Sequence, residues 1–220
     1  MIDLHTHSIF SDGELIPSEL VRRARVNGYR AIAITDHMDS SNMDFIIPRL
    51  VRIADELNTI QPVKIIPGAE LTHLPPELIP EGIKKARKLG ALIVVVHGET
   101  LVEPVQEGTN RAAIAGGADI LSHPGLIDEE DVKYAAAQGV VLELSARKGH
   151  CLSNGYVARL AQQYGARLVI NTDAHSPGDL IDREFAEKII LAAGLDTTVL
   201  SRVFDTSEEI VKSVFLQGGD

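Results

Sequence analysis

The chain has 220 residues, of which 45% are hydrophobic, and its formal net charge at pH 7 is -10. This length predicts one domain over residues 1–220 with a full core, because α/β barrels commonly reach this size undivided. The negative charge disfavours a broad surface for nucleic-acid backbones, and the single cysteine, Cys151, excludes an internal disulfide.

The start of the chain carries no basic segment followed by a long apolar one. No apolar stretch approaches the roughly 20 residues that cross a bilayer. A lone cysteine also suits a reducing compartment. We therefore expect a cytoplasmic protein with no membrane partner.

Seven short apolar runs alternate with segments of helical period along the whole chain. The runs are continuous, which is typical of parallel strands that are buried on both faces. This order predicts a parallel α/β sheet, closed or open, with helices outside it, and seven strands indicate an irregular barrel. The runs are Ile2 to His7, Ala31 to His37, Val63 to Glu70, Leu92 to His97, Asp119 to His123, Val140 to Glu143 and Leu168 to His175.

Prolines, glycines and acidic caps delimit the expected helices at 17–28, 80–90, 128–139, 153–165 and 182–194. Pro48 is expected to start or kink the helix that contains it. The spacing of Thr206 and Glu209 predicts a capping box at the start of the last helix. The least regular stretch, Glu99 to Gly108, is a candidate loop over a site.

Each apolar run ends in a residue that can bind a metal, or in a near equivalent. In an extended strand end, side chains two residues apart point the same way, as expected for His5 with His7 and for Asp173 with His175. The carboxyl ends of barrel strands meet at one rim, so these residues should share one site. The candidates are His5, His7, Asp12, His37, Glu70, His97, His123, Asp173 and His175.

The chemistry of this set favours particular ions. Imidazole and carboxylate without thiolate suit Zn, Mn or Fe better than Mg or Ca, and argue against a purely structural zinc site. Nine candidates exceed the needs of one tetrahedral ion and suit two or three. Ions about 3.5–4 Å apart are the standard arrangement for phosphoester hydrolysis.

In their order along the chain, these motifs resemble the polymerase and histidinol phosphatase (PHP) family. The motifs are His5-Thr6-His7, Ser11-Asp12-Gly13, Thr35-Asp36-His37, Gly68-Ala69-Glu70, His97, Ser122-His123-Pro124 and Asp173-Ala174-His175-Ser176. The resemblance covers nearly the whole chain. It implies a distorted seven-stranded (β/α)7 barrel of the TIM type, with the metals at the carboxyl-terminal rim.

The resemblance also implies a trinuclear centre and a reaction. A phosphate monoester of a small metabolite, histidinol phosphate being one candidate, would be hydrolysed by a metal-activated hydroxide. Asp12 stands where many relatives have histidine, and its charge favours metals other than zinc. By position, the first ion's ligands are His5, His7, Glu70 and Asp173, the second's are Asp12, His37 and His175, and the third's are His97 and His123 with Glu70 as a bridge.

Residues beyond the nine have weaker assignments. Arg147, just past the sixth strand end, is expected to clamp the phosphate bidentately or to pair with a carboxylate. Arg183 is a second substrate-binding candidate, although the first turn of a helix also accounts for it. His73 and His150 are expected outside the direct ligand set. Glu143 is expected to orient a neighbouring ligand.

Three other functions stay open at this point. A nuclease or nucleotide phosphatase acting on terminal phosphates would use the same chemistry, although the net charge and the few aromatic residues disfavour nucleic acid. Amidohydrolases share a similar barrel, but they resemble a pattern with a bridging lysine where this chain has Glu70. A non-catalytic metal-stabilised module is disfavoured because no ligand position is lost.

Overall fold

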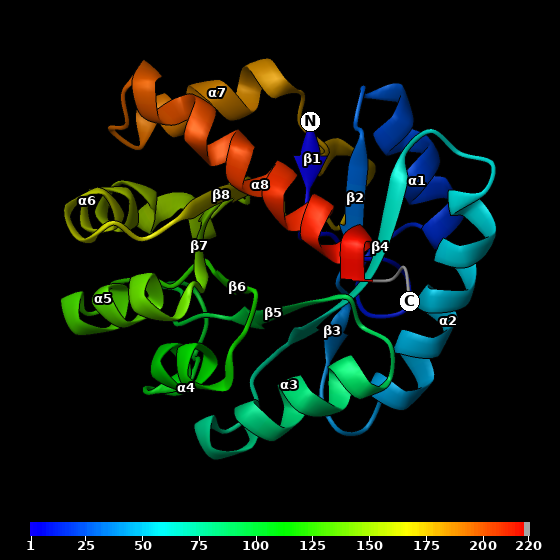
Figure 1. Ribbon diagram of the computed structural model, residues 1–220, viewed down its shortest axis with the longest axis horizontal. Helices are drawn as coiled ribbons and strands as arrows, with labels where there is room; N and C mark the ends of the chain where they lie inside the picture. Colours follow the sequence, from blue (N-terminus) through cyan, green and yellow to red (C-terminus); the bar gives the residue numbers. More distant parts are fainter. Residues whose placement is uncertain (218–220) are drawn as a thin grey trace.

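The computed structural model describes residues 1–217 and confirms the predicted barrel. Seven parallel strands follow one another around the sheet in chain order, with helices outside them (Figure 1). The strands are almost entirely buried, which explains their continuous apolar sequences. They are β1 (Ile2–Asp3), β2 (Ala31–Ile34), β4 (Lys64–Leu71), β5 (Ile93–His97), β6 (Ile120–Ser122), β7 (Val141–Ser145) and β8 (Leu168–Asn171).

Backbone contacts beyond β1 and β8 join the first strand to the last. Thr6 and Ala174 form a parallel bridge. The N–H of Asp173 donates to the carbonyl oxygen of His5 at 3.0 Å, and the N–H of His7 donates to that of Ala174 at 2.9 Å. The barrel therefore closes at its carboxyl-terminal rim. This closure places two ligand-bearing segments from opposite ends of the chain side by side.

A short strand, β3 (His37–Met38), continues β2 after a break at Thr35 and Asp36. Both strands pair with β4 in the same register, so the break does not shift the pairing. The Asp36 carboxylate accepts hydrogen bonds from the backbone N–H and the hydroxyl of both Ser8 and Ser11. The break in the strand thus fixes the loop that follows β1.

The helices fall close to the predicted ranges. Gly139 and Gly165 directly follow two of them with positive φ, the conformation that ends helices and favours glycine. Pro48 lies inside a helix that begins five residues earlier, at Met43. The helices are α1 (Pro17–Val26), α2 (Met43–Asn58), α3 (Ile79–Lys88), α4 (Thr109–Gly116), α5 (Glu129–Gln138), α6 (Asn154–Tyr164), α7 (Arg183–Ala192) and α8 (Thr197–Gln217), with 3-10 turns at Pro76–Leu78, His150–Ser153 and Pro177–Asp179.

The last helix begins earlier than the sequence pattern predicted. Asp196 precedes α8, and its carboxylate accepts hydrogen bonds from the N–H groups of Thr198 and Val199 at 2.8 and 3.1 Å. Thr206 lies inside the helix, where its hydroxyl donates to the carbonyl oxygen of Arg202 at 2.9 Å. The predicted capping box is therefore wrong, because the same spacing also occurs within a helix whose true cap lies upstream.

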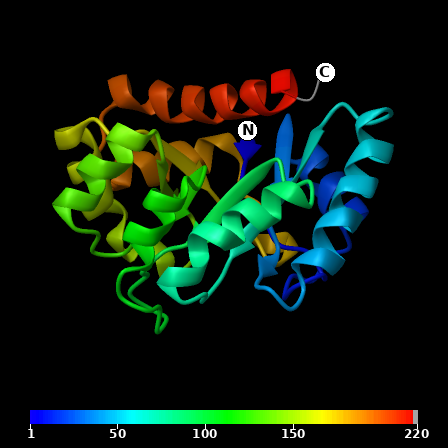
Figure 2. The same ribbon diagram turned by 60° about the horizontal axis from the view of Figure 1, so that its bottom comes forward.

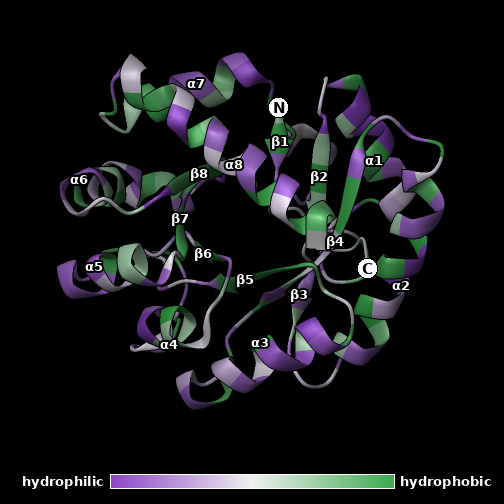
Figure 3. Ribbon diagram, viewed as in Figure 1, coloured by the Kyte–Doolittle hydropathy of each residue, from purple (hydrophilic) through white to green (hydrophobic). Residues whose placement is uncertain are grey.

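Helix α8 lies across one end of the barrel (Figure 2). Its residues Ile210, Val211 and Val214 pack against apolar side chains inside the barrel, among them Ile2 and Val95. In Figure 3 the strands are largely hydrophobic, whereas the helices alternate between hydrophobic and hydrophilic residues. Since α8 contacts the start of β1, it covers the amino-terminal end of the barrel, opposite the rim where the strands finish. Among residues 1–217, no helix is long and apolar enough to cross a membrane.

Candidate metal centre

The carboxyl-terminal rim brings all nine predicted ligands together. They form overlapping groups in which one donor atom of each residue lies within 4.8 Å of the others. The groups are His5 with His7 and Glu70; His7 with Asp12, His37 and His175; His5 with His123 and Asp173; and His97 with His123 and His150. Because the groups share members, they form one continuous cluster rather than separate sites.

Glu70, near the end of β4, lies at the middle of the cluster and is fully buried. Its Oε1 lies 3.1 Å from Nε2 of His5, and its Oε2 lies 2.6 Å from Nδ1 of His37. The hydroxyl of Ser122 donates to Oε1 at 2.9 Å. Burial alone would raise the pKa of Glu70, but the neighbouring histidines outweigh it and hold the pKa well below its usual range. Glu70 thus contacts histidines that belong to different groups of the cluster, and these histidines favour its charged form.

Asp173 is the second buried carboxylate of the cluster. Its Oδ1 lies 3.1 Å from Nε2 of His7 and 3.6 Å from Nε2 of His5. Burial raises the pKa of Asp173, since the charged form loses its contact with water. Asp173 and His123 also have positive φ values, of 52° and 27°. Non-glycine residues rarely adopt this backbone conformation, and where they do, it concentrates at functional sites.

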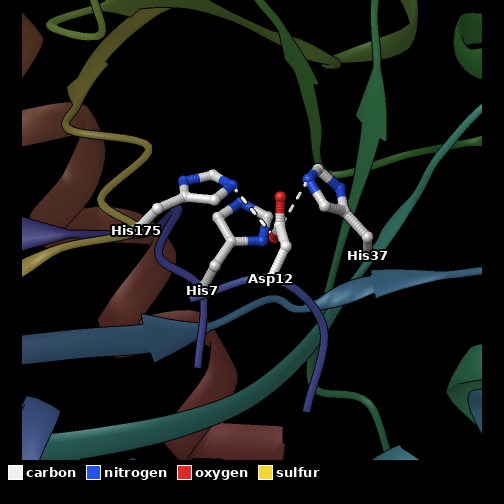
Figure 4. Close-up of side chains that lie close together, drawn as sticks. All are labelled: His7, Asp12, His37 and His175. Carbon is white, nitrogen blue, oxygen red and sulfur yellow. Dashed lines mark ion pairs between the residues drawn. The ribbon is translucent and has the colours of Figure 1, made fainter. Parts of the chain in front are cut away.

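Asp12 approaches the cluster from the loop after β1. Its Oδ1 lies 3.1 Å from Nε2 of His175 and 3.6 Å from Nε2 of His37. Figure 4 shows these three side chains and His7 pointing toward one another. The Asp12 side chain is 57% exposed, so this group lies at the open edge of the cluster.

Two imidazoles of the cluster, those of His5 and His175, are oriented in the same way. Nδ1 of His5 lies 2.8 Å from Oε2 of the buried Glu143, and Nδ1 of His175 lies 2.9 Å from the carbonyl oxygen of Asp173. A histidine that donates from Nδ1 keeps its lone pair on Nε2, the usual orientation of a metal ligand. In both residues Nε2 faces a carboxylate of the cluster. The predicted orienting role of Glu143 agrees with this placement.

The buried polar atoms of the cluster provide a test of whether a metal fits. Within residues 1–217, several have no hydrogen-bond partner, namely Nε2 of His5, both ring nitrogens of His7 and His123, Nδ1 of His97 and Oδ1 of Asp173. Such atoms are rare, because leaving one unpaired costs about 1–3 kcal/mol. Donors about 2.1 Å from a tetrahedral ion lie about 3.4 Å apart. The 3.1 and 3.6 Å separations in the cluster match this spacing. The residues therefore fit bound cations.

Arg147 lies beside the cluster, as its position after β7 predicted. Its Nη1 donates to the carbonyl oxygen of Asp173 at 3.1 Å and lies 2.8 Å from Nδ1 of His175. Its Nε lies 3.7 Å from Oδ2 of Asp173, and the side chain is 32% exposed. The guanidinium is therefore at the rim and reachable from solvent. Its contact with phosphate stays a prediction.

Arg183 lies elsewhere. Its Nε donates to Oε1 of Glu187 at 3.0 Å, and its guanidinium lies 4.1 Å from the centre of the Phe204 ring. It is also close enough to the amino group of Met1 to lower the pKa of that group, although burial lowers it more. Met1 directly precedes β1, so Arg183 is at the amino-terminal end of the barrel, opposite the cluster. Its predicted contact with a substrate at the cluster is contradicted by this position.

Three residues outside the predicted ligand set reach the cluster. The carboxylate of Glu103 lies 3.2 Å from Nε2 of His97, 3.4 Å from Nε2 of His150 and 3.4 Å from Nε2 of His73. The bond from His97 lowers the pKa of Glu103 to about 2, and burial lowers the pKa of His150 to about 4. The expectation that ligands lie at strand ends could not identify them, because Glu103 and His73 lie in loops and His150 begins a 3-10 turn. The irregular stretch that contains Glu103 was the one available signal.

Comparison with known proteins adds five similarities: a family model, two relatives in sequence and two solved structures. The PHP domain model matches residues 3–151. An uncharacterised protein of Methanocaldococcus jannaschii is 50% identical over 96% of this chain and 99% of its own length. A probable phosphatase of Thermoanaerobacter sp. is 30% identical over 89% of this chain and 87% of its own.

Two solved structures have the same fold. The first, archaeal ribonuclease P with mature tRNA, contains a chain that matches with a TM-score of 0.77 at 18% identity, over 100% of this chain and 94% of that one. The second is histidinol phosphate phosphatase of Lactococcus lactis with zinc, L-histidinol and phosphate, with a TM-score of 0.61 at 18% identity over 89% and 94%. At these identities the two structures establish the barrel, and nothing further about this chain follows from them alone.

Proposed function

This chain belongs to the PHP domain family, and from this premise we propose that it hydrolyses phosphate monoesters of small metabolites at a centre of two or three divalent transition metal ions. The broader activity, a metal-dependent phosphoesterase, agrees with the relative named as a phosphatase and with the likeness to histidinol phosphate phosphatase. Histidinol phosphate is a candidate substrate, and zinc, manganese and iron are candidate ions.

The observation that carries the proposal is the set of unpartnered nitrogen and oxygen atoms at the rim. His5, His7, Glu70 and Asp173 would hold one ion, and Asp12, His37 and His175 a second. His97 and His123 would hold a third, with Glu70 as a bridge. When bound, such ions supply a water-derived nucleophile near neutral pH and neutralise charge on the phosphoryl oxygens. The protein's part is to hold the donors in place before the substrate arrives.

Arg147 is the residue we assign to the phosphoryl group. Nδ1 of His175 can accept a hydrogen bond from Arg147 only when Nδ1 carries no proton. In the tautomer with a free Nε2, Nδ1 carries the proton and donates to the carbonyl oxygen of Asp173. That tautomer releases Nη1 of Arg147 from His175. The guanidinium keeps its contacts with Asp173, from Nη1 to the carbonyl oxygen and from Nε to Oδ2. Its Nη2 group and the second hydrogen of Nη1 are then left to bind two phosphoryl oxygens, the geometry that arginine favours.

A nuclease or nucleotide phosphatase is the second candidate. Its support is the likeness to a chain of archaeal ribonuclease P, which extends over the whole of this chain. Against it stands the net charge of -10, since a nucleic-acid footprint needs clustered cations. Terminal phosphates of short oligonucleotides remain compatible with the same metal cluster and with Arg147.

The test is a substrate panel with defined metal content. Protein stripped of metal is reconstituted separately with Mn²⁺, Fe²⁺ and Zn²⁺, and bound ions are counted by elemental analysis. Each form is assayed on small phosphate monoesters including histidinol phosphate, on a phosphodiester, and on a 5′-phosphorylated oligonucleotide. The Asp173→Asn variant, purified in parallel, controls for contaminating phosphatases.

We expect phosphate release from monoesters with at least one metal, and at least a hundredfold less from the Asp173→Asn variant. Equal or faster hydrolysis of the oligonucleotide would favour the second candidate. Protein that binds its ions but releases no phosphate from any ester contradicts both.

A further inference from the structure

We propose that His150 and Glu103 are ligands of the third metal ion, alongside His97 and His123, and that the loop over residues 99–108 is therefore held at the site by the ion. The inference rests on the proposed metal centre and extends its ligand set. It assigns a metal-binding role to two residues that do not lie at strand ends. It also explains how the loop is held over the rim, since Glu103 lies on the loop and would bind the ion.

His150 has the surroundings of a ligand. It is 4% exposed, and one donor atom of each of His97, His123 and His150 lies within 4.8 Å of the others. The His150 and His123 rings are stacked, with centroids 4.1 Å apart. Nε2 of His150 lies 3.8 Å from Oδ2 of Asp173, so this nitrogen faces the cluster. Within the described residues, Nε2 of His150 has ion-pair contacts only with the carboxylates of Asp173 and Glu103.

Thr100 fixes the orientation of the His150 ring. Its Oγ1 lies 2.7 Å from Nδ1 of His150, and both residues are buried. When Nδ1 donates to this hydroxyl, the lone pair of Nε2 is left for the cluster. Glu143 does the same for His5. An orienting acceptor on the far nitrogen is the usual support of a histidine that binds a metal.

Glu103 brings a carboxylate next to both His97 and His150. Its Oε2 lies 3.2 Å from Nε2 of His97, and its Oε1 lies 3.4 Å from Nε2 of His150. Both separations match those between donors of one tetrahedral ion, about 3.4 Å. Adding Glu103 also supplies a second carboxylate, beside the bridging Glu70, to a pocket whose other direct donors are imidazoles. A charged oxygen donor strengthens the binding of a divalent cation.

Hydrogen bonds and side-chain packing hold the loop that carries Thr100 and Glu103. Oε1 of Glu99 accepts hydrogen bonds from the N–H groups of Gly108 and Asn110 at 3.0 and 2.9 Å, which ties the two ends of the loop together. At the other side, the Val102 side chain packs against Gly149, directly before His150. Thr100 and Glu103 therefore lie on one loop that is held at both sides. An ion bound to Glu103 would restrain the whole loop.

His73 marks the outer edge of this pocket. Its Nε2 lies 3.4 Å from Oε2 of Glu103, and its side chain is 42% exposed. It has positive φ, like His123 and Asp173, and these three are the only non-glycine residues of the described chain that do. We assign His73 to positioning the Glu103 carboxylate rather than to direct binding, since it groups with His97 and Glu103 but not with His123 and His150.

The test counts ions. Metal-free protein is titrated with Mn²⁺, and stoichiometry and dissociation constants are measured by calorimetry, with elemental analysis after desalting. The variants are Glu103→Gln, His150→Ala and Thr100→Val. Glu107→Gln is the matched control, because Glu107 lies on the same loop, is exposed and forms no ion pair within residues 1–217.

We expect three ions per chain in the native protein and in Glu107→Gln. Glu103→Gln and His150→Ala should raise the dissociation constant of one ion at least tenfold while leaving the other two unchanged. Thr100→Val should act in the same direction more weakly. Hydrogen exchange of residues 101–106 should slow when Mn²⁺ is added to the native protein, and not in Glu103→Gln.

Three ions bound with unchanged constants in Glu103→Gln and Thr100→Val overturn the inference, whether or not His150→Ala folds. A native protein that binds only two ions overturns it as well. These readouts do not depend on hydrolysis. If the ions behave as expected but no ester is cleaved, the proposed function fails and the ligand assignment stands.

Discussion

Nδ1 of His5 lies 2.8 Å from Oε2 of Glu143, and both side chains are fully buried. The Nδ2 group of Asn171 donates to the same oxygen at 2.9 Å. Glu143 is therefore held in place by a second residue while it orients His5. The ring of His5 in turn directs Nε2 toward Glu70 and Asp173. Residues from β7 and β8 thus set the direction of a donor that follows β1.

The first prediction tests this support. Glu143→Gln keeps the shape of the side chain but removes the charge that makes His5 a stronger donor. We expect metal affinity to fall about 10- to 100-fold, with little change in the far-ultraviolet circular dichroism. Metal titration measures the effect. Glu81→Gln, exposed on α3, serves as control, and equal affinity in both variants would remove Glu143 from the metal support.

The second prediction concerns removal of the metals. Buried donors without partners destabilise the fold, and an ion that binds only the folded state stabilises it. At a free metal concentration 100 times the dissociation constant, each ion contributes about 2.7 kcal/mol. For a chain of this size we expect chelation to lower Tm by roughly 5 °C or more. Scanning calorimetry before chelation, after it, and after restoring the metal checks this. The same Tm in all three states would argue against a native metal centre.

A third prediction separates binding from chemistry at Arg147. Arg147→Ala should raise KM for phosphate monoesters about 10- to 100-fold, the loss of a charged hydrogen-bonding pair. Arg147→Lys should restore little, because a lysine cannot bind two phosphoryl oxygens in a fork. Lys148→Ala removes a neighbouring exposed charge and should leave KM unchanged. Steady-state kinetics on all three decide the matter, and unchanged KM and kcat in Arg147→Ala would reject the clamp.

The fourth prediction tests how α8 holds the amino-terminal end of the barrel. Val214 is buried against the interior cluster, so Val214→Asp would place an unpaired charge in apolar surroundings. We expect the free energy of unfolding to fall by more than about 3 kcal/mol. Ser213→Asp adds the same charge on the exposed face and should change it by less than about 1 kcal/mol. Urea denaturation compares them, and equal losses would mean that α8 is not a structural cover.

A fifth prediction concerns Tyr29, which is 4% exposed just beyond α1. Its hydroxyl donates to the carbonyl oxygen of Ile181 at 2.9 Å. Tyr29→Phe leaves that carbonyl without its partner, so we expect a loss of about 1–2 kcal/mol in the free energy of unfolding. Tyr156→Phe is the control, since the Tyr156 ring packs beside Arg159 and its hydroxyl has no hydrogen bond within residues 1–217. A similar loss in both variants would contradict the assigned bond.

The strand order and eight of the nine rim residues could be predicted because both depend on local sequence, whereas Asp12, in the loop after β1, was assigned by its place between the ligand pairs and by the family resemblance. Continuous apolar runs indicate buried parallel strands, and parallel strands finish at one rim whatever the loops do. Thr206 was misread because the spacing of a capping box also occurs within helices. The position of Arg183 could not be predicted, because its separation from His175 in sequence does not show at which end of the barrel the first turn of α7 lies.

His150 and Glu103 could not be assigned from sequence for a different reason. Neither ends a strand, and the contact between them joins two loops that are 47 positions apart, a pairing set only by the folded backbone. Gly149, with φ of 93°, turns the chain immediately before His150. A glycine in a loop does not by itself indicate the direction in which the next side chain points.

The cover that α8 forms has a consequence for turnover. Helix α8 blocks the amino-terminal end of the barrel and apolar side chains fill its interior. Within the described residues, the cluster is reached from the carboxyl-terminal rim, where Asp12 is exposed and Arg147 is partly exposed. In the proposed reaction, incoming ester and outgoing phosphate would both pass this rim and bind the same guanidinium. Inorganic phosphate should therefore behave as a competitive inhibitor, and accumulating product should slow the reaction well before the ester is exhausted.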